Sequence, residues 1–131
     1  MVEWKGTEKF TRVYQKGQVI FEENSLGTEM FVVQSGKVRL TTNQPGSEVD
    51  LGIVGPGEFF GEMALVDRSP RTATATADED DTKLVVLDEE RFLYLAGQQL
   101  PFAMTIMQGL CRRIRDRWDL YSKVSKTIRC E

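Results

Sequence analysis

The sequence predicts a mainly β domain, a barrel or jelly roll, with helices at its C-terminal end. Short apolar stretches with period-two alternation fill the first ninety residues, and Gly, Pro, Asn and Asp separate them. After residue 88 the apolar residues recur every three or four positions, which is typical of a helix. The chain has 131 residues, enough to bury one core, so we expect a single domain over residues 1–131.

The strands are expected within a barrel that spans about residues 7–88. Ser35 and Gly36 predict a compact hairpin turn, because glycine accepts a positive φ. Val49, Leu51 and Ile53 alternate and predict a half-buried face on one strand. The expected strands cover 11–15, 19–23, 30–34, 37–42, 49–54, 71–77 and 82–88, with an acidic turn at 78–81.

Two helices are expected, over about 89–97 and 101–126. Asp88 is a suitable N-cap for the first, Gly97 ends it, and Pro101 suits the start of the second. An apolar stripe follows the second helix through Phe102, Ile106, Leu110, Ile114, Trp118, Tyr121 and Val124. A helix of roughly six turns is longer than a small barrel is wide. We therefore expect part of the stripe to meet a second copy of the chain, and packing on its own barrel is the alternative.

Composition narrows the function classes. The chain has no histidine and two cysteines, Cys111 and Cys130, so we expect no metal site and no cofactor. A net charge of −3 disfavours nucleic acid as the main partner, although basic residues gather after Arg112. No apolar run is long enough to cross a bilayer, and the N-terminus lacks a signal-peptide core. We expect a cytoplasmic protein without a membrane partner.

The stretch GEFFGEMALVDRSPRTATATA, residues 57–77, holds the candidate site. Residues 61–66 predict one or two helical turns, whose N-terminus favours an anion, and Arg71 is a permanently charged donor suited to phosphate. A carboxylate would repel that phosphate, so Glu62 fits only if it accepts a hydrogen bond from a neighbouring hydroxyl, such as a ribose 2′-OH. For two isolated residues, a Glu62–Arg71 ion pair closing a surface loop is the alternative.

The order of residues in FGEMALVDRSPRTAT resembles the phosphate-binding cassette of cyclic-nucleotide-binding domains. The segments KGQVIF, MFVVQSGKVRL and LGIVGPGEFFGEM fit the same family. The resemblance covers about residues 10–120 and implies a double-stranded β-helix jelly roll followed by a short helix and a long C-terminal helix. It implies that Arg71 binds the cyclic phosphate and that Glu62, helped by the backbone of Gly61, binds the ribose 2′-OH.

The resemblance also implies roles for other residues. The N–H groups of Ala64 and Thr72 would complete the phosphate cradle, and the Thr72 hydroxyl would bind phosphate or purine. Arg113 falls near the position at which some relatives contact the purine, with Arg112 and Trp118 as rivals. The implied ligand-binding set is Gly61, Glu62, Met63, Ala64, Arg71, Thr72, Ala73 and Arg113.

We therefore expect a non-catalytic sensor that binds a cyclic nucleotide and signals by moving its C-terminal helix. We favour cyclic AMP, because stand-alone modules of this kind more often use it. Cyclic GMP is the alternative, since a threonine after the arginine occurs where that nucleotide is preferred.

Other functions are weaker alternatives. A metal enzyme of the cupin type needs histidines, and the consecutive acids 78–81 cannot all converge on one ion. A regulator-like module could sense haem, an iron–sulfur cluster or an aromatic acid. The missing histidines and few cysteines disfavour the first two, and the Glu62 and Arg71 pair disfavours the third.

The chain departs from the family pattern in two places. Few residues precede the first expected strand, so the usual N-terminal helix is short or missing. No helix-turn-helix module follows the long helix within these residues. We therefore expect the signal to pass to a second copy of the chain or to an unknown effector protein rather than to DNA.

Overall fold

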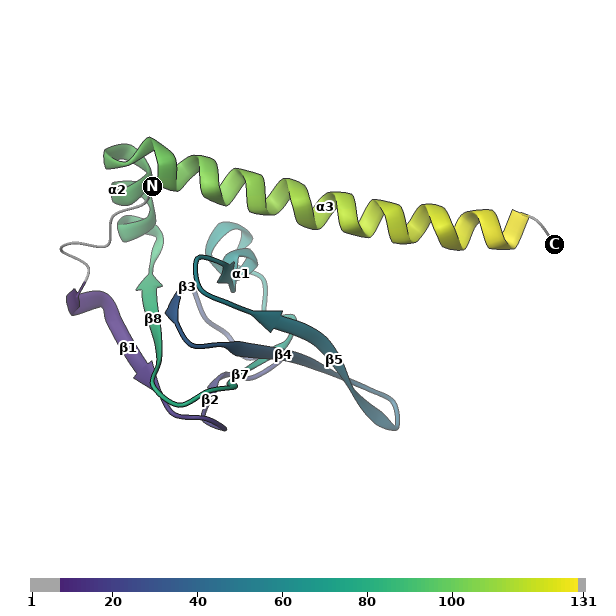
Figure 1. The fold of residues 1–131 in the computed structure, drawn as a ribbon, viewed down its shortest axis with the longest axis horizontal. Helices are drawn as coiled ribbons and strands as arrows, with labels where there is room; N and C mark the ends of the chain where they lie inside the picture. The colour runs from purple at the N-terminus through teal and green to yellow at the C-terminus, as the bar shows by residue number, and fades with distance from the viewer. Residues whose placement is uncertain (1–7, 130–131) are drawn as a thin grey trace. The chain divides into compact units, whose positions relative to one another are not determined.

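The computed structural model describes the backbone of residues 8–129 and the side chains of residues 9–116 except that of Gln44. The described residues fall into two compact units, of which the first ends at Tyr94 and the second begins at Leu95. The first unit contains the strands, which form two four-stranded sheets (Figure 1). The mainly β jelly-roll fold expected from the sequence is confirmed.

All strand pairs in the two sheets are antiparallel. A short 3₁₀ helix, Glu8–Phe10, precedes them. The first sheet has the order β1 (Thr11–Tyr14), β8 (Thr82–Leu87), β3 (Met30–Ser35) and β6 (Phe59–Phe60). The second has the order β2 (Val19–Phe21), β7 (Thr74–Ala77), β4 (Val38–Gln44) and β5 (Ser47–Val54).

The core of the first unit lies between the two sheets. Both sheets supply its buried residues, as expected when two apolar sheet faces pack together. The first sheet contributes Phe31, Val33, Phe60, Leu84 and Val86, and the second contributes Val38, Val54 and Ala75. The alanines of the Thr/Ala alternation therefore face inward: Ala73, Ala75 and Ala77 are all buried.

The hairpin expected at Ser35 and Gly36 is wrong, because the two strands on either side of this turn do not pair with each other. β3 pairs with β6 and β8, whereas β4 pairs with β5 and β7, so the chain crosses from one sheet to the other at this turn. Gly36 does adopt a positive φ of 87°, and a Cβ there would lie 2.7 Å from the Cα of Thr82. Gly36 therefore packs closely on Thr82, which a sequence pattern cannot reveal.

The half-buried face expected on 49–54 is also wrong. Val49, Leu51 and Ile53 are all exposed, and the buried residue of β5 is Val54. β5 is the outer strand of its sheet, and its register with β4 shifts beside Leu51. Every residue from Ser47 to Ile53 is exposed, so neither face of this outer strand is buried there.

Two further differences concern the ends of strands. β6, Phe59–Phe60, was not expected, because two residues are too few to show a period. The strand expected over 71–77 begins only at Thr74, so Arg71 lies in the segment before β7.

The helices lie close to their expected positions. α1 covers Glu62–Asp67, α2 covers Glu89–Gln98 and α3 covers Leu100–Arg129. The Asp88 carboxylate accepts a hydrogen bond of 2.8 Å from the Arg91 backbone N–H, which confirms the predicted cap of α2. No helix in the described part of the chain is long and apolar enough to cross a membrane.

Burial decreases along the stripe of α3. Phe102 and Ile106 are buried, Leu110 is half-buried, and Ile114 is 69 % exposed. The expected continuation through Trp118, Tyr121 and Val124 lies outside the described side chains. The extent of a single domain over residues 1–131 stays a prediction.

Glu23 connects the segment after β2 to β4 and gives the unit an acid-sensitive contact. Thr42 donates its hydroxyl to this carboxylate over 2.5 Å, and the Asn43 N–H donates over 2.9 Å. These bonds, led by that from Thr42, lower the pKa of Glu23 from its usual 4.5. A lowered pKa adds stability above pH 4.5 that is lost as the pH falls through the folded-state value.

We predict that Glu23→Gln lowers the free energy of unfolding at pH 7 and flattens its decline as the pH falls below 4.5, because the uncharged amide does not titrate. Urea unfolding at several pH values measures both effects. Glu48→Gln, at an exposed carboxylate on β5, is the control. Parallel pH profiles for wild type and Glu23→Gln would contradict the prediction.

Candidate functional site

The candidate site begins at Gly61, the residue before α1. Gly61 has a left-handed φ of 78°, and α1 starts at the next residue, Glu62. A Cβ on Gly61 would lie 2.8 Å from Nη1 of Arg71 and 3.3 Å from the carbonyl oxygen of Glu29. Glycine is therefore required here both for the backbone conformation and for the close approach of Arg71.

The backbone of Arg71 pairs with the segment that follows β2. The Arg71 N–H donates to the carbonyl of Ser25 over 2.9 Å, and the Asn24 N–H donates to the carbonyl of Arg71 over 2.7 Å. Asn24 tolerates the positive φ of 68° that this contact needs. These bonds continue the pairing of β2 with β7. They bring the Arg71 side chain beside Gly27 and Glu29.

The guanidinium of Arg71 is buried, with only 5 % of the residue exposed. Its Nη1 donates to the carbonyl oxygen of Glu29 over 2.7 Å and to that of Gly61 over 3.3 Å. Its Cζ lies 4.2 Å from the ring centroid of Phe21 and 5.7 Å from that of Phe31. The cation is thus held by two neutral carbonyls and two aromatic faces.

Not every donor of this buried cation is used. Nε of Arg71 is buried and has no hydrogen-bond partner. Burial lowers the pKa of Arg71, and the nearby charge of Glu29 acts in the opposite direction. The Glu29 carboxylate itself pairs with Arg12 over 3.5 Å, whereas Arg71 bonds only to the Glu29 backbone carbonyl. A buried donor without an acceptor costs about 1–3 kcal/mol, more when charged, so this donor set is suited to an anion.

Gly27 lets the backbone of residues 24–29 approach the unused donor closely. A Cβ on Gly27 would lie 2.5 Å from Nη2 and 2.9 Å from Nε of Arg71. The contribution of residues 24–29 to the site is not visible in the sequence pattern. Carbonyl acceptors such as that of Glu29 carry no residue-type signal, so spacing could not have revealed them.

The structure places the other expected site residues around Arg71 in two groups. Glu62, Met63 and Ala64 form the first turn of α1, in which Ala64 is buried and Met63 is 48 % exposed. Thr72 and Ala73 lead from Arg71 into β7, with Thr72 exposed and Ala73 buried. The predicted roles of these residues stay proposals.

The residues expected to contact the base lie on α3, in the second unit. Arg113 is half-buried and Arg112 is exposed. The side chain of Trp118 lies outside the described residues. The contact of Arg113 with a purine stays a prediction.

The acidic turn before β8 does not form a cluster. Asp78 pairs with Arg39 over 3.3 Å and Glu79 with Lys37 over 3.5 Å. Asp80 and Asp81 accept hydrogen bonds from Lys16 and Gln15. Among the described residues no group of acids, cysteines and histidines could hold a metal ion.

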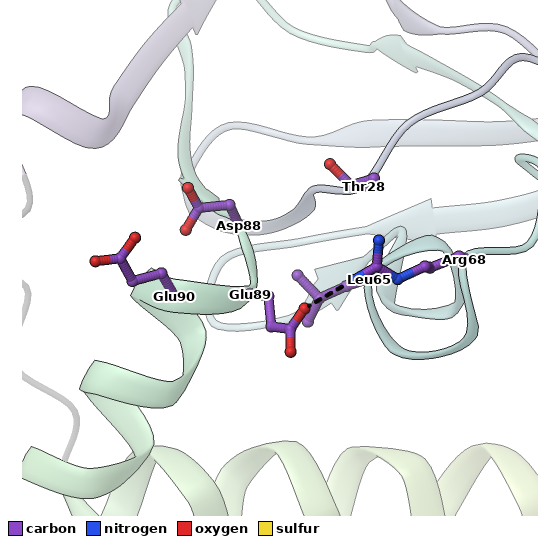
Figure 2. Close-up of a pocket in the computed structure, with 6 residues that line it drawn as sticks. All are labelled: Thr28, Leu65, Arg68, Asp88, Glu89 and Glu90. Carbon is purple, nitrogen blue, oxygen red and sulfur yellow. Dashed lines mark hydrogen bonds and ion pairs between the residues drawn. The ribbon is translucent and has the colours of Figure 1, made fainter.

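A separate hollow of about 220 Å³ lies on the first unit, near the start of α2 (Figure 2). Arg68 and Glu89 face each other across it in an exposed ion pair of 3.3 Å. Its lining consists of Thr28, Leu65, Arg68, Asp88, Glu89 and Glu90. Three of the six are acidic, so its chemistry is less suited to a phosphate than that of Arg71.

A two-sheet β roll, with a short helix and a buried arginine after its sixth strand, is the architecture of a small-ligand-binding domain. The family model of the cyclic nucleotide-binding domain matches residues 11–99. The chain therefore belongs to the cyclic nucleotide-binding domain family.

Named relatives agree with this assignment. The chain is 42 % identical over 106 residues to the cyclic AMP receptor protein of Thermus thermophilus, which covers 80 % of this chain and 49 % of the relative. It is 30 % identical over 90 residues to the regulatory subunit of cAMP-dependent protein kinase from Mycosarcoma maydis. This match covers 66 % of this chain and 17 % of the relative. The chain thus spans half or less of the length of these relatives.

Solved structures are similar as well. The catabolite activator protein of Thermus thermophilus superposes with a TM-score of 0.76 at 40 % identity, over 88 % of this chain and 54 % of that one. A structure described under a cyclic-GMP-dependent signalling pathway of bacterial phytopathogenesis superposes with a TM-score of 0.67 at 29 % identity, over 83 % and 89 %.

We predict that Gly61→Ala destabilises the protein more than Gly57→Ala does. Both residues have a positive φ, for which alanine costs roughly 1–2 kcal/mol, but a Cβ on Gly57 meets no atom within 4 Å. At Gly61 the methyl group must also displace Arg71, and such overpacking costs about 1–3 kcal/mol more. Urea unfolding of both variants measures the difference, and equal destabilisation would contradict the close approach.

Proposed function

We propose that this protein is a non-catalytic sensor that binds a cyclic nucleotide monophosphate and signals by moving its C-terminal helix. The observation that supports this most strongly is Arg71. Its buried guanidinium uses only neutral acceptors and keeps Nε without a partner. A cyclic phosphate diester carries the single negative charge and the acceptor oxygens that this donor lacks.

In this proposal Glu62 makes the site prefer a nucleotide over free phosphate, because its carboxylate binds the sugar. Its place at the start of α1, directly after Gly61, puts a carboxylate on the element that contacts Arg71. In this proposal Glu62 accepts a hydrogen bond from the ribose 2′-OH, while Arg71 binds the phosphate. The N–H groups of Ala64 and Thr72 complete the phosphate contacts, and Arg113 contacts the base.

We favour cyclic AMP as the ligand. Support comes from the Thermus thermophilus relative, which is named a cyclic AMP receptor protein and is 42 % identical to this chain. Cyclic GMP is the alternative, because a similar bacterial structure is described under cyclic-GMP-dependent signalling. Titration with both nucleotides distinguishes them.

We also propose that α3 carries the signal through a second copy of the chain. Leu100, Met104, Met107 and Ile114 are apolar and 43–70 % exposed on this helix. Exposed apolar side chains at helical spacing are suited to helix–helix contact. An effector protein bound by the same helix is the alternative.

We predict that Arg71→Ala weakens cyclic-nucleotide binding by at least about tenfold, because a hydrogen bond to a charged group contributes about 1.5–3 kcal/mol. Titration calorimetry with cyclic AMP and cyclic GMP measures the loss. Arg68→Ala is the matched control, because Arg68 is exposed and pairs with Glu89. Chromatography of the nucleotide after incubation should recover it unchanged.

Two outcomes would oppose this proposal. If Arg71→Ala binds as tightly as wild type, Arg71 is not the phosphate ligand. If the nucleotide is hydrolysed by the wild type, the protein is not a pure sensor.

A further inference from the structure

Hydrogen bonds define only part of the position of the Arg71 guanidinium. Both of its bonds, to Glu29 and Gly61, are made by Nη1. Nε has no partner, so no hydrogen bond fixes the opposite side of the group. Something else must set the plane of the guanidinium and the direction of its unused donor.

The ring of Phe21 lies against the guanidinium of Arg71. Its centroid lies 4.2 Å from Cζ of Arg71, well within the distance at which a cation is attracted to an aromatic face. Phe21 also lies beside Gly61, since a Cβ there would be 3.5 Å from Cε2 of the ring. The same ring therefore lies beside both Arg71 and Gly61, whose carbonyl accepts a hydrogen bond from Nη1 of Arg71.

The core holds this ring in place from behind. Phe21 ends β2 and pairs with Ala75 of β7. Its centroid lies 5.8 Å from that of Phe31 and 5.7 Å from that of Phe60, and those two rings stack at 5.2 Å. Because Phe31 and Phe60 belong to the buried core, Phe21 is a rigid link between the core and the site.

We propose that Phe21 is a positioning residue, whose ring face sets the orientation in which Arg71 receives the phosphate of a bound nucleotide. This inference rests on the proposed cyclic-nucleotide site. It attributes to Phe21 an electrostatic contribution to ligand affinity, besides the apolar contacts that any large side chain would make. Phe31, at 5.7 Å from Cζ, supports the same cation from a greater distance.

The test replaces Phe21 with phenylalanines that carry one, two and three ring fluorines. Fluorine withdraws electron density from the ring face with little change in size, so it weakens attraction to a cation while packing is kept. The same series at Phe60 is the matched control, because that ring contacts Phe21 and Phe31 in the core. Phe21→Leu, a substitution by a standard amino acid, removes the aromatic ring altogether. Thermal unfolding checks that each protein is folded.

We expect the dissociation constant for cyclic AMP, measured by calorimetry, to rise stepwise with each fluorine at Phe21. The full loss should be about twofold to thirtyfold, the range that corresponds to a cation–π contact of about 0.5–2 kcal/mol. The series at Phe60 should leave the dissociation constant unchanged. Phe21→Leu should bind at least as weakly as the most fluorinated protein.

The possible failures are distinguishable. Unchanged affinity across the Phe21 series, with strong loss in Arg71→Ala, would overturn the role of Phe21 and leave the proposed function standing. Equal loss at Phe21 and Phe60 would indicate a general effect of the core and would also overturn it. A wild-type protein that binds neither cyclic AMP nor cyclic GMP would overturn both the inference and the proposed function.

Discussion

The structure of the site depends on one buried cation. Arg71 lies with its guanidinium against Phe21 and with Nη1 on the carbonyls of Glu29 and Gly61. Removing a charged group from water is costly unless partners replace the water. Here the partners are neutral or aromatic, and Nε keeps none. This unused donor is the reason for proposing that the site binds an anion.

The jelly roll explains how three distant segments meet at this arginine. β2 and β7 are neighbours, so the segment after β2 hydrogen-bonds with the backbone of Arg71. β3 and β6 are neighbours in the other sheet, which brings Glu29, just before β3, to Gly61, just after β6. The site thus lies where segments from both sheets approach each other, and the core rings behind it belong to those same strands.

Much of this could be predicted from the sequence, because strand alternation, the Asp88 cap and the ordered residues between Gly61 and Arg71 are visible as residue types. Three features could not. Gly36 looks like a hairpin residue, yet the strands before and after it belong to different sheets. β5 lies at the edge of its sheet, and its alternating apolar residues are exposed. The Glu29 carbonyl and the Phe21 ring act through geometry, and a backbone acceptor or a core-type side chain gives no functional signal in a sequence.

The most direct test of the buried anion site is the ¹⁵N NMR signal of the Arg71 Nε–Hε group during titration with cyclic AMP. A new hydrogen bond to phosphate should shift this signal downfield and slow its exchange with water, because the unused donor gains an acceptor. The account predicts that this shift saturates together with ligand binding. A signal that stays in place while backbone amides elsewhere respond would place the nucleotide away from Arg71 and contradict the account.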